Sequence, residues 1–150
     1  MNQYRHLGVY GICVEQGKIL LIKKARGPHT GKWDLPGGTI EHGETPEETL
    51  CREWEEETGI VGISYSLYSV ESYQMEITLA SGEEEDLHHL GILYTVNLLH
   101  SPMSLKVNGD GEDSLGAEWI DVGALSPECV TPFVYKAIKD IQQQTTGSSL

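Results

Sequence analysis

The stretch that most constrains this chain runs from residue 38 to residue 60 and reads GTIEHGETPEETLCREWEEETGI. Its second half carries the signals of a helix. Thr45, Pro46 and Glu48 are typical of a helix start, because a hydroxyl and a carboxylate can bond the first backbone N–H groups and proline lacks one. Gly59 is typical of a helix end. The sequence therefore predicts a helix between these signals.

The predicted helix collects carboxylates on one flank. At about 100° per residue, Glu53, Glu56 and Glu57 share that flank, whereas Leu50 and Trp54 form an apolar one. Glutamates three and four positions apart repel by about 0.2–0.5 kcal/mol per pair. They form either a solvated acidic face or a ligand set for a hard divalent cation such as Mg²⁺, which turns the repulsion into attraction.

Seven polar and glycine residues stand at particular spacings in this stretch: Gly38, Glu44, Arg52, Glu53, Glu56, Glu57 and Gly59. With Trp54 and Ile60, they resemble the signature of the Nudix hydrolases, GX5EX7REUXEEXGU, where U is a bulky apolar residue. The family more often has Leu, Ile or Val in place of Trp54. The resemblance implies hydrolysis of a pyrophosphate linkage in a nucleoside diphosphate joined to another group, with Mg²⁺ as cofactor and Mn²⁺ as a substitute.

The resemblance also implies which groups bind the metal: the backbone carbonyl of Gly38 and the carboxylates of Glu53, Glu56 and Glu57. The preceding Leu-Pro-Gly-Gly turn suits this arrangement, because glycine lets the backbone approach closely.

Further roles follow from the same resemblance. Arg52 is always protonated and forked, so we expect it to pair with a signature glutamate and fix its rotamer. Glu44 would join that network or the outer shell of the metal. Glu53 is the first candidate for the catalytic base. Asp113 or Glu112, in the loop before the strand that contains Trp119, is the alternative.

The charge balance restricts the partners. A net charge of −13 argues against nucleic acid, whose phosphates are held by Lys and Arg surfaces. Five of the ten Lys and Arg residues nevertheless fall between positions 18 and 32. They either offset the repulsion between an acidic protein and a polyphosphate, or keep a hairpin soluble. We therefore expect a small-molecule nucleotide as partner and allow for a homodimer.

Length and hydropathy limit the class of protein. The chain has 150 residues, which suits a single domain over 1–150. It has no apolar run near the roughly 18 residues of a membrane span and no signal peptide pattern. We therefore expect a cytoplasmic protein with no membrane partner.

The predicted elements alternate between strands and helices, which indicates an α+β or mixed α/β fold. The resemblance implies the Nudix α/β/α sandwich, a mixed sheet between helices. We expect a hairpin of residues 7–14 and 18–24, strands at 61–73 and 89–99 around a turn at 82–86, a helix over 133–143, and a frayed tail at 145–150.

Residues outside the signature determine the substrate specificity. In the family, ADP-ribose hydrolases carry a proline about fifteen residues after the signature, and dinucleoside polyphosphate hydrolases carry a tyrosine slightly further on. The chain has Met75 to Thr78 at these positions. It therefore resembles the MutT-type enzymes that cleave nucleoside triphosphates, including oxidised or non-standard ones. The alternatives are an ADP-ribose or nucleotide-sugar pyrophosphatase and, in another class, a module that senses a nucleotide without cleaving it.

Overall fold

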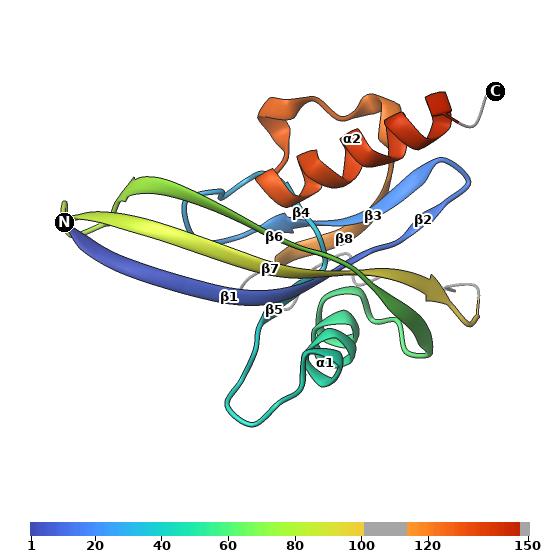
Figure 1. Ribbon diagram of the computed structural model, residues 1–150, viewed down its shortest axis with the longest axis horizontal. Coiled ribbons are helices and arrows are strands. Elements are labelled where there is room, and N and C mark those ends of the chain that lie inside the picture. The colour runs from blue at the N-terminus through green and yellow to red at the C-terminus, as the bar shows by residue number, and fades with distance from the viewer. Residues whose placement is uncertain (101–113, 148–150) are drawn as a thin grey trace.

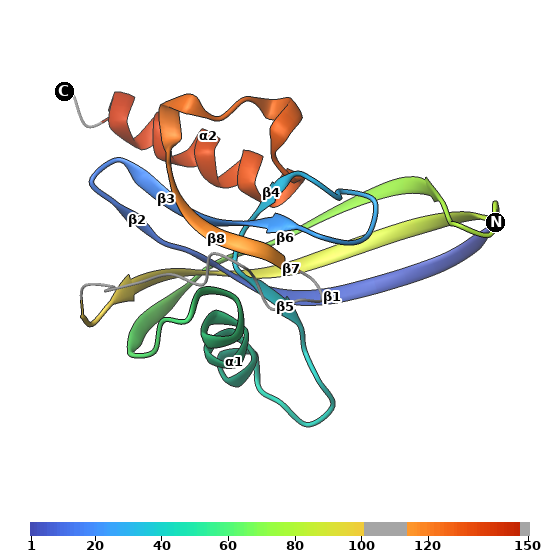
Figure 2. The same ribbon diagram turned by 180° about the vertical axis from the view of Figure 1, so that it is seen from behind.

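A computed structural model of the protein describes residues 1–100 and 114–147, and it has three layers. The helix α1 (Pro46–Thr58) lies on one side of a layer of strands and α2 (Pro132–Gly147) on the other (Figures 1 and 2). The expected mixed α/β sandwich is therefore confirmed. In the described ranges neither helix is long and apolar enough to cross a membrane.

The first sheet has the strand order β5-β1-β7-β6. Its strands are β1 (Asn2–Ile12), β5 (Gly37–Thr39), β6 (Ile63–Thr78) and β7 (Glu84–Leu98). β1 runs parallel to β7, whereas β5 and β6 pair antiparallel with their neighbours. The sheet is therefore mixed, as expected, and β5 carries the start of the signature to its edge.

The second sheet is built on β3. It contains β2 (Val14–Glu15), β3 (Lys18–Lys24) and β4 (Trp33–Asp34), and β8 (Ser114–Asp121) pairs with β3. The prediction that residues 7–14 form one arm of a hairpin is wrong for most of that run. Within it, only Val14 belongs to β2, the strand that pairs with β3 as the prediction requires. β1 instead pairs with β7, and the chain changes sheets at Cys13, whose carbonyl accepts the Leu20 N–H at 3.0 Å.

Two other predicted boundaries are also wrong. β7 already begins at Glu84, so the turn expected over 82–86 is shorter. α2 continues to Gly147, beyond the end that was expected at residue 143. The short turns η1 (Val122–Ala124) and η2 (Pro127–Cys129) connect β8 to α2.

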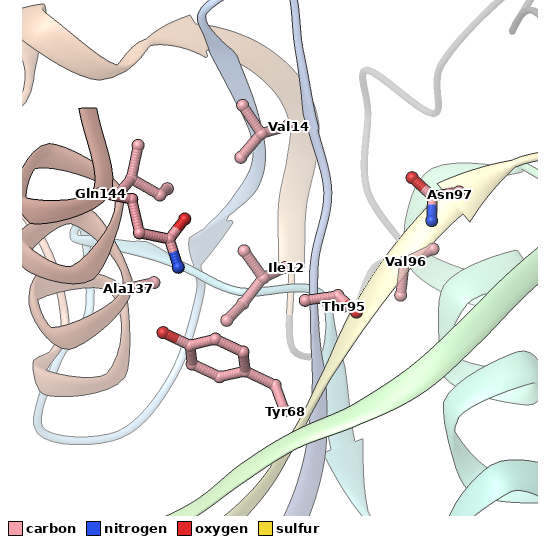
Figure 3. Close-up of a pocket in the computed structure, with 9 residues that line it drawn as sticks. Ile12, Val14, Tyr68, Thr95, Val96, Asn97, Ala137 and Gln144 are labelled. Atoms are coloured by element: carbon pink, nitrogen blue, oxygen red, sulfur yellow. The ribbon is translucent and has the colours of Figure 1, made fainter. Parts of the chain in front are cut away.

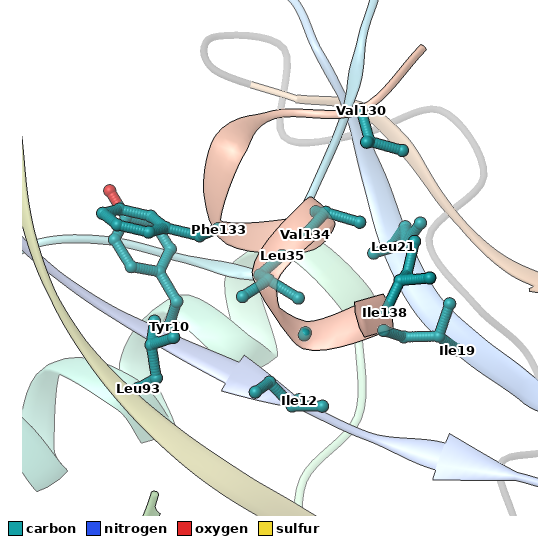
Figure 4. Packing of buried hydrophobic residues seen from close by; sticks show 11 residues of the cluster. Tyr10, Ile12, Ile19, Leu21, Leu35, Leu93, Val130, Phe133, Val134 and Ile138 are labelled. Atoms are coloured by element: carbon teal, nitrogen blue, oxygen red, sulfur yellow. The ribbon is translucent and has the colours of Figure 1, made fainter. Parts of the chain in front are cut away.

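The strand layer is apolar on both faces, because successive side chains of a strand point to opposite sides. Val9 and Leu20 face α1, whereas Tyr10 and Leu21 face α2. Figure 4 shows the cluster under α2, which includes Ile12, Ile19, Leu35, Leu93, Val130, Phe133, Val134 and Ile138. Both helices are thus fixed to one rigid layer.

Candidate active site

The start of α1 is fixed by a reciprocal cap. The Thr45 hydroxyl accepts the Glu48 N–H at 3.1 Å, and the Glu48 carboxylate accepts the Thr45 N–H at 3.0 Å. Gly59 ends the helix in the left-handed region at φ 78°. The predicted helix start and end are therefore confirmed, and α1 is held at both termini.

The apolar flank of α1 fixes its rotation against the sheets. Leu50 and Trp54 are fully buried. A methyl group at Gly11 of β1 would overlap the Trp54 ring and approach Val96 at 2.8 Å. The glycine therefore makes room for the large ring, which explains how this chain accommodates tryptophan at a position where a smaller residue is more usual. The glutamates lie on the neighbouring flank, where Glu57 is buried as well.

Gly37 brings the loop before α1 against β1. Its φ of 149° and the overlap that a side chain there would have with the Val9 carbonyl both require glycine. Its N–H donates to Glu57 Oε1 at 2.7 Å, and Glu57 is only 1% exposed. A buried carboxylate of α1 is thus tied to the backbone of β5.

Gly38 lies directly under a second carboxylate. A methyl group at Gly38 would stand 2.7 Å from the carboxylate carbon of Glu53. The absence of a side chain therefore lets this carboxylate rest against the loop backbone. Gly38 of β5 and Glu53 of α1 are thus in close proximity, and Glu57 bonds the neighbouring Gly37.

Arg52 organises the remaining glutamates. Its guanidinium donates to both oxygens of Glu44, at 2.7 and 2.9 Å, and to Glu53 Oε1 at 3.0 Å. It also lies 3.3 Å from Glu56 Oε2, and its Nη2 donates to the Thr39 carbonyl at 3.3 Å. The expected pairing with signature glutamates is confirmed, and Glu44 belongs to this network.

These contacts change the proton affinity of the groups involved. The hydrogen bond from Arg52, assisted by the Glu41 N–H, lowers the pKa of Glu44 to about 2. The carboxylate of Glu44 in turn raises the pKa of Arg52. The pair therefore stays ionised over the whole physiological range.

The donor set of the flank suits a hard cation, because Glu53, Glu56 and Glu57 offer carboxylate oxygens. In the arrangement described, Glu53 and Glu56 both contact Arg52, and across residues 1–100 and 114–147 no three acidic, histidine or cysteine side chains stand close enough to hold an ion. The metal ligands therefore stay a prediction. Glu112 and Asp113, the alternative bases, lie outside the described residues.

A cavity of about 200 Å³ lies near the start of α2, where Asp34, His89 and Phe133 contribute to its lining. Lys24 and Arg26 line it, whereas Lys23 stands 5.5 Å from the centre of the Trp33 ring. Two of the five clustered cations are therefore placed at a cavity. Burial raises the pKa of the nearby Tyr10 well above the usual value, and the charges of Asp34 and Glu57 add to the shift.

One wall of the cavity is a chain of hydrogen bonds that sequence reasoning missed. His89 Nε2 lies 2.9 Å from the Tyr10 hydroxyl, and its Nδ1 lies 2.8 Å from the Tyr73 hydroxyl. Tyr73 also lies 3.2 Å from His29 Nε2. Burial lowers the pKa of His89 to about 3, so the ring is neutral. The four residues are distant in sequence, and the only signal was His89 itself, in a strand.

Asp34 is the second group that was missed. It is 6% exposed, and its Oδ1 accepts the Leu35 N–H at 2.8 Å and the Thr131 hydroxyl at 2.7 Å. Burial raises its pKa, while Lys24, Thr131 and the Leu35 N–H act in the opposite direction. Its position directly before Leu-Pro-Gly-Gly was the available signal.

A larger cavity, of about 300 Å³, lies elsewhere, between α2 and the strands β1, β6 and β7. Figure 3 shows its lining, where Ile12, Val14 and Val96 are accompanied by the polar residues Thr95 and Asn97. Among the described residues, its lining includes no signature residue and no lysine, arginine or carboxylate. The smaller cavity differs in having Lys24, Arg26 and Asp34 in its lining, although no residue of 38–60 is among its described lining residues either.

Known proteins with a similar fold or a similar sequence were found. A crystal structure of a MutT NUDIX hydrolase from Burkholderia pseudomallei superposes with a TM-score of 0.69 and 29% identity, covering 91% of this chain and 97% of that one. An ADP-ribose pyrophosphatase from Methanocaldococcus jannaschii is 33% identical over 79% of this chain and 63% of its own length. An 8-oxo-dGTP diphosphatase from Escherichia coli is 39% identical over 40% of this chain and 47% of its own length.

The matched region thus spans about half to two thirds of these two curated relatives. The family model described as the NUDIX domain matches residues 4–141, which include both sheets, α1 and the cavity. This chain belongs to the NUDIX family.

Proposed function

We propose that this protein is a Mg²⁺-dependent pyrophosphohydrolase whose substrate is a nucleoside diphosphate joined to another group, with a nucleoside triphosphate as the main substrate. The observation that supports this most is that Glu57 and Glu53 lie against Gly37 and Gly38 of β5, while Arg52 donates to Glu53. A protein that only senses a nucleotide has no need for this full set of carboxylates.

The residues that would hold the metal are Glu53, Glu56 and Glu57, with the carbonyl of Gly38. When bound, Mg²⁺ supplies charge neutralisation on the phosphate oxygens and activation of a water molecule; Mn²⁺ serves the same purpose. Binding requires Glu53 and Glu56 to give up part of their contact with Arg52, and Arg52 keeps its two bonds to Glu44.

The other residues position these groups. Arg52 and Glu44 hold the flank of α1 at a set orientation, since a forked, doubly bonded pair leaves few rotamers. The Gly37 N–H holds Glu57 in place. Glu53, which is 13% exposed in its side chain and rests on Gly38, is the proposed base, with Asp113 or Glu112 as the alternative. Lys24 and Arg26 would attract the anionic substrate toward this acidic protein.

A second substrate class is favoured by a specific observation. The relative from Methanocaldococcus jannaschii, which is 33% identical, is an ADP-ribose pyrophosphatase. Against it stands the segment from Met75 to Thr78, which lacks the proline expected of ADP-ribose hydrolases. ADP-ribose therefore belongs in every substrate test.

The test is a panel of nucleoside triphosphates, oxidised nucleotides, nucleotide sugars and ADP-ribose, incubated with and without Mg²⁺. The products to detect are phosphate, pyrophosphate and nucleoside monophosphate. We expect Mg²⁺-dependent release of a monophosphate and pyrophosphate from a triphosphate. If the protein binds a compound but cleaves none of them, the result would support the sensing alternative and overturn the proposal that the protein is an enzyme.

A further inference from the structure

β5 is the shortest strand of the first sheet, and it carries the start of the signature. It has three residues, Gly37–Thr39, and lies at the edge of the sheet, where β1 is its only strand partner in the described part of the chain (Figure 1). An edge strand has one row of backbone groups without a sheet partner. The end of β5 therefore depends on contacts other than those of the sheet ladder.

Thr39, the last residue of β5, lies opposite a residue without a side chain. Its partner across the strand pair is Gly8 of β1. The space above Gly8 is occupied by Tyr10, because a methyl group at Gly8 would overlap the Tyr10 ring. The side-chain contact comes instead from the diagonal position, since Nε2 of His6 lies 2.7 Å from the Thr39 hydroxyl oxygen.

His6 is itself held on the face of the sheet that α2 covers. Its ring stacks on that of His89, with the ring centres 4.4 Å apart and the planes inclined by 15°. Both ring nitrogens of His89 bond tyrosine hydroxyls, and its ring centre lies 4.9 Å from that of Phe133 on α2. His6 therefore rests on a group that is fixed on several sides, and it extends that constraint to Thr39.

The backbone of Thr39 is bound from the opposite side of the layer. Its carbonyl accepts Nη2 of Arg52, on α1, at 3.3 Å, and the same nitrogen donates to Glu44 Oε1 at 2.9 Å. The two helices lie on opposite sides of the strands (Figure 2). Because the peptide unit is planar, a residue held at its side chain and at its carbonyl has little freedom left. A change at the hydroxyl should therefore shift the carbonyl.

The contact between His6 and Thr39 can be removed from either side with little change in shape. Valine resembles threonine but has no hydroxyl, and phenylalanine has a ring that can stack but no ring nitrogen. Serine keeps the hydroxyl, and the glutamine amide can bond it in place of Nε2. The direction of the native bond does not matter for this choice, because a hydroxyl can either donate or accept.

We propose that His6 is a positioning residue of this hydrolase: through the Thr39 hydroxyl it fixes the end of β5, and with it the carbonyl on which the Arg52 guanidinium rests. Its effect on the reaction is indirect, through Thr39 and Arg52. The inference rests on the proposed function for the reaction whose rate is measured, whereas the state of Arg52 can be measured without turnover.

The first test follows the Arg52 Nε–H by NMR in the whole protein without metal. Its exchange with solvent reports how firmly the guanidinium is held. In His6→Phe and in Thr39→Val we expect exchange to be roughly 2-fold to 10-fold faster, the range that one neutral hydrogen bond accounts for. Thr39→Ser and His6→Gln should stay near the wild-type rate. The matched control is Thr78→Val, at an exposed threonine that ends β6 on the other edge of the same sheet.

The second test is steady-state kinetics of the same variants on the best substrate of the panel. His6→Phe and Thr39→Val should each lower kcat roughly 2-fold to 10-fold and leave KM nearly unchanged, because a misplaced Arg52 affects the carboxylates of α1. The double variant should lose no more than either single variant, since both remove the same bond. Thr39→Ser and His6→Gln should restore kcat.

Wild-type exchange of the Arg52 Nε–H in both His6→Phe and Thr39→Val would overturn the positioning role, whatever the rates. Losses of kcat that add in the double variant would also overturn it, because the two residues would then act separately. A wild type that cleaves nothing on the panel would contradict the proposed function. Faster exchange in the two variants would in that case still support the inference that His6 holds Arg52 through Thr39.

Discussion

Arg52 holds Glu44 through two parallel hydrogen bonds, from Nε to Oε2 at 2.7 Å and from Nη2 to Oε1 at 2.9 Å. Glu44 lies before α1 and Arg52 in its middle, so the pair joins the loop to the helix. The third nitrogen of the fork is thereby directed to Glu53 and Glu56. A lysine ammonium has no such fork.

Arg52→Lys should therefore lower kcat more than it changes KM. Misplacement of catalytic groups by about 1 Å can cost on the order of 100-fold in rate, and we expect a loss of that order. Steady-state kinetics on the best substrate of the panel check it. Arg5→Lys, on β1 and outside the signature, is the control and should be unaffected. Unchanged kcat in Arg52→Lys would rule out the positioning role.

Glu56→Gln should abolish most activity and leave the fold intact. The side chain is half exposed, and loss of one negative charge relieves repulsion on the helix. As a proposed metal ligand, its removal should reduce kcat/KM by at least roughly 100-fold. Glu55→Gln changes the same charge one position earlier, at an exposed site, and should behave as wild type. Near-normal turnover by Glu56→Gln would place the metal elsewhere.

Substitutions of the two glycines of β5 should have different effects, one mainly on stability and the other mainly on activity. Gly37→Ala meets the backbone carbonyl of Val9 at an unfavourable φ, so we expect it to lower the free energy of unfolding by about 1–3 kcal/mol or more. For Gly38→Ala the nearest atoms to the new methyl group belong to the end of the Glu53 side chain, which can move. It should unfold near the wild-type temperature while losing activity. Urea unfolding and kinetics of both variants decide this, and equal loss of stability in both would contradict it.

Gly11 and Trp54 should behave as one packing unit. Gly11→Ala alone overpacks the ring and should cost about 1–3 kcal/mol. Trp54→Leu alone leaves a cavity and should cost about 2–4 kcal/mol, somewhat below the range for removal of a whole tryptophan side chain. In the double variant the added methyl group occupies vacated space. In a double-mutant cycle, the loss of stability in the double variant should be smaller than the sum of the two single losses by about 0.5–3 kcal/mol. Strict additivity would show that the two residues do not share this space.

His89 should make the protein less stable in mild acid. Burial lowers its pKa to about 3 in the folded state, while the unfolded chain has about 6.5. Below pH 6.5 the unfolded state therefore binds one proton more, and the free energy of unfolding falls as pH is lowered toward 3. The slope from this residue is at most about 1.4 kcal/mol per pH unit.

Urea unfolding at pH 7, 6 and 5 measures this slope in wild type and in His89→Gln, which cannot titrate. The remaining groups titrate in both proteins, so the difference isolates His89. Identical slopes would mean that His89 is protonated in the folded state as well.

Much of α1 was predictable because its determinants are local. The Thr45 and Glu48 cap, the stop at Gly59 and the common flank of Glu53, Glu56 and Glu57 all follow from spacing along a single helix. The same local spacing carried the resemblance to the family.

The sheet pairing was less predictable. The apolar pattern of residues 7–14 indicated a strand, and a strand was found there. Its partner was misjudged, because alternation identifies the buried face and says nothing of whether the neighbour is β3 or β7. Parallel pairing with β7 joins residues about eighty positions apart, and no local signal encodes it.

The sequence by itself determined the helix, its carboxylate flank and the family. Only the tertiary structure decided that Asp34, Tyr73 and His89 surround one cavity. The physical reason is that hydrogen bonds such as Asp34 to Thr131, across 97 positions, depend on how the two sheets and α2 pack. Those contacts arise from burial of apolar surface contributed by the whole chain, which no short stretch of sequence specifies.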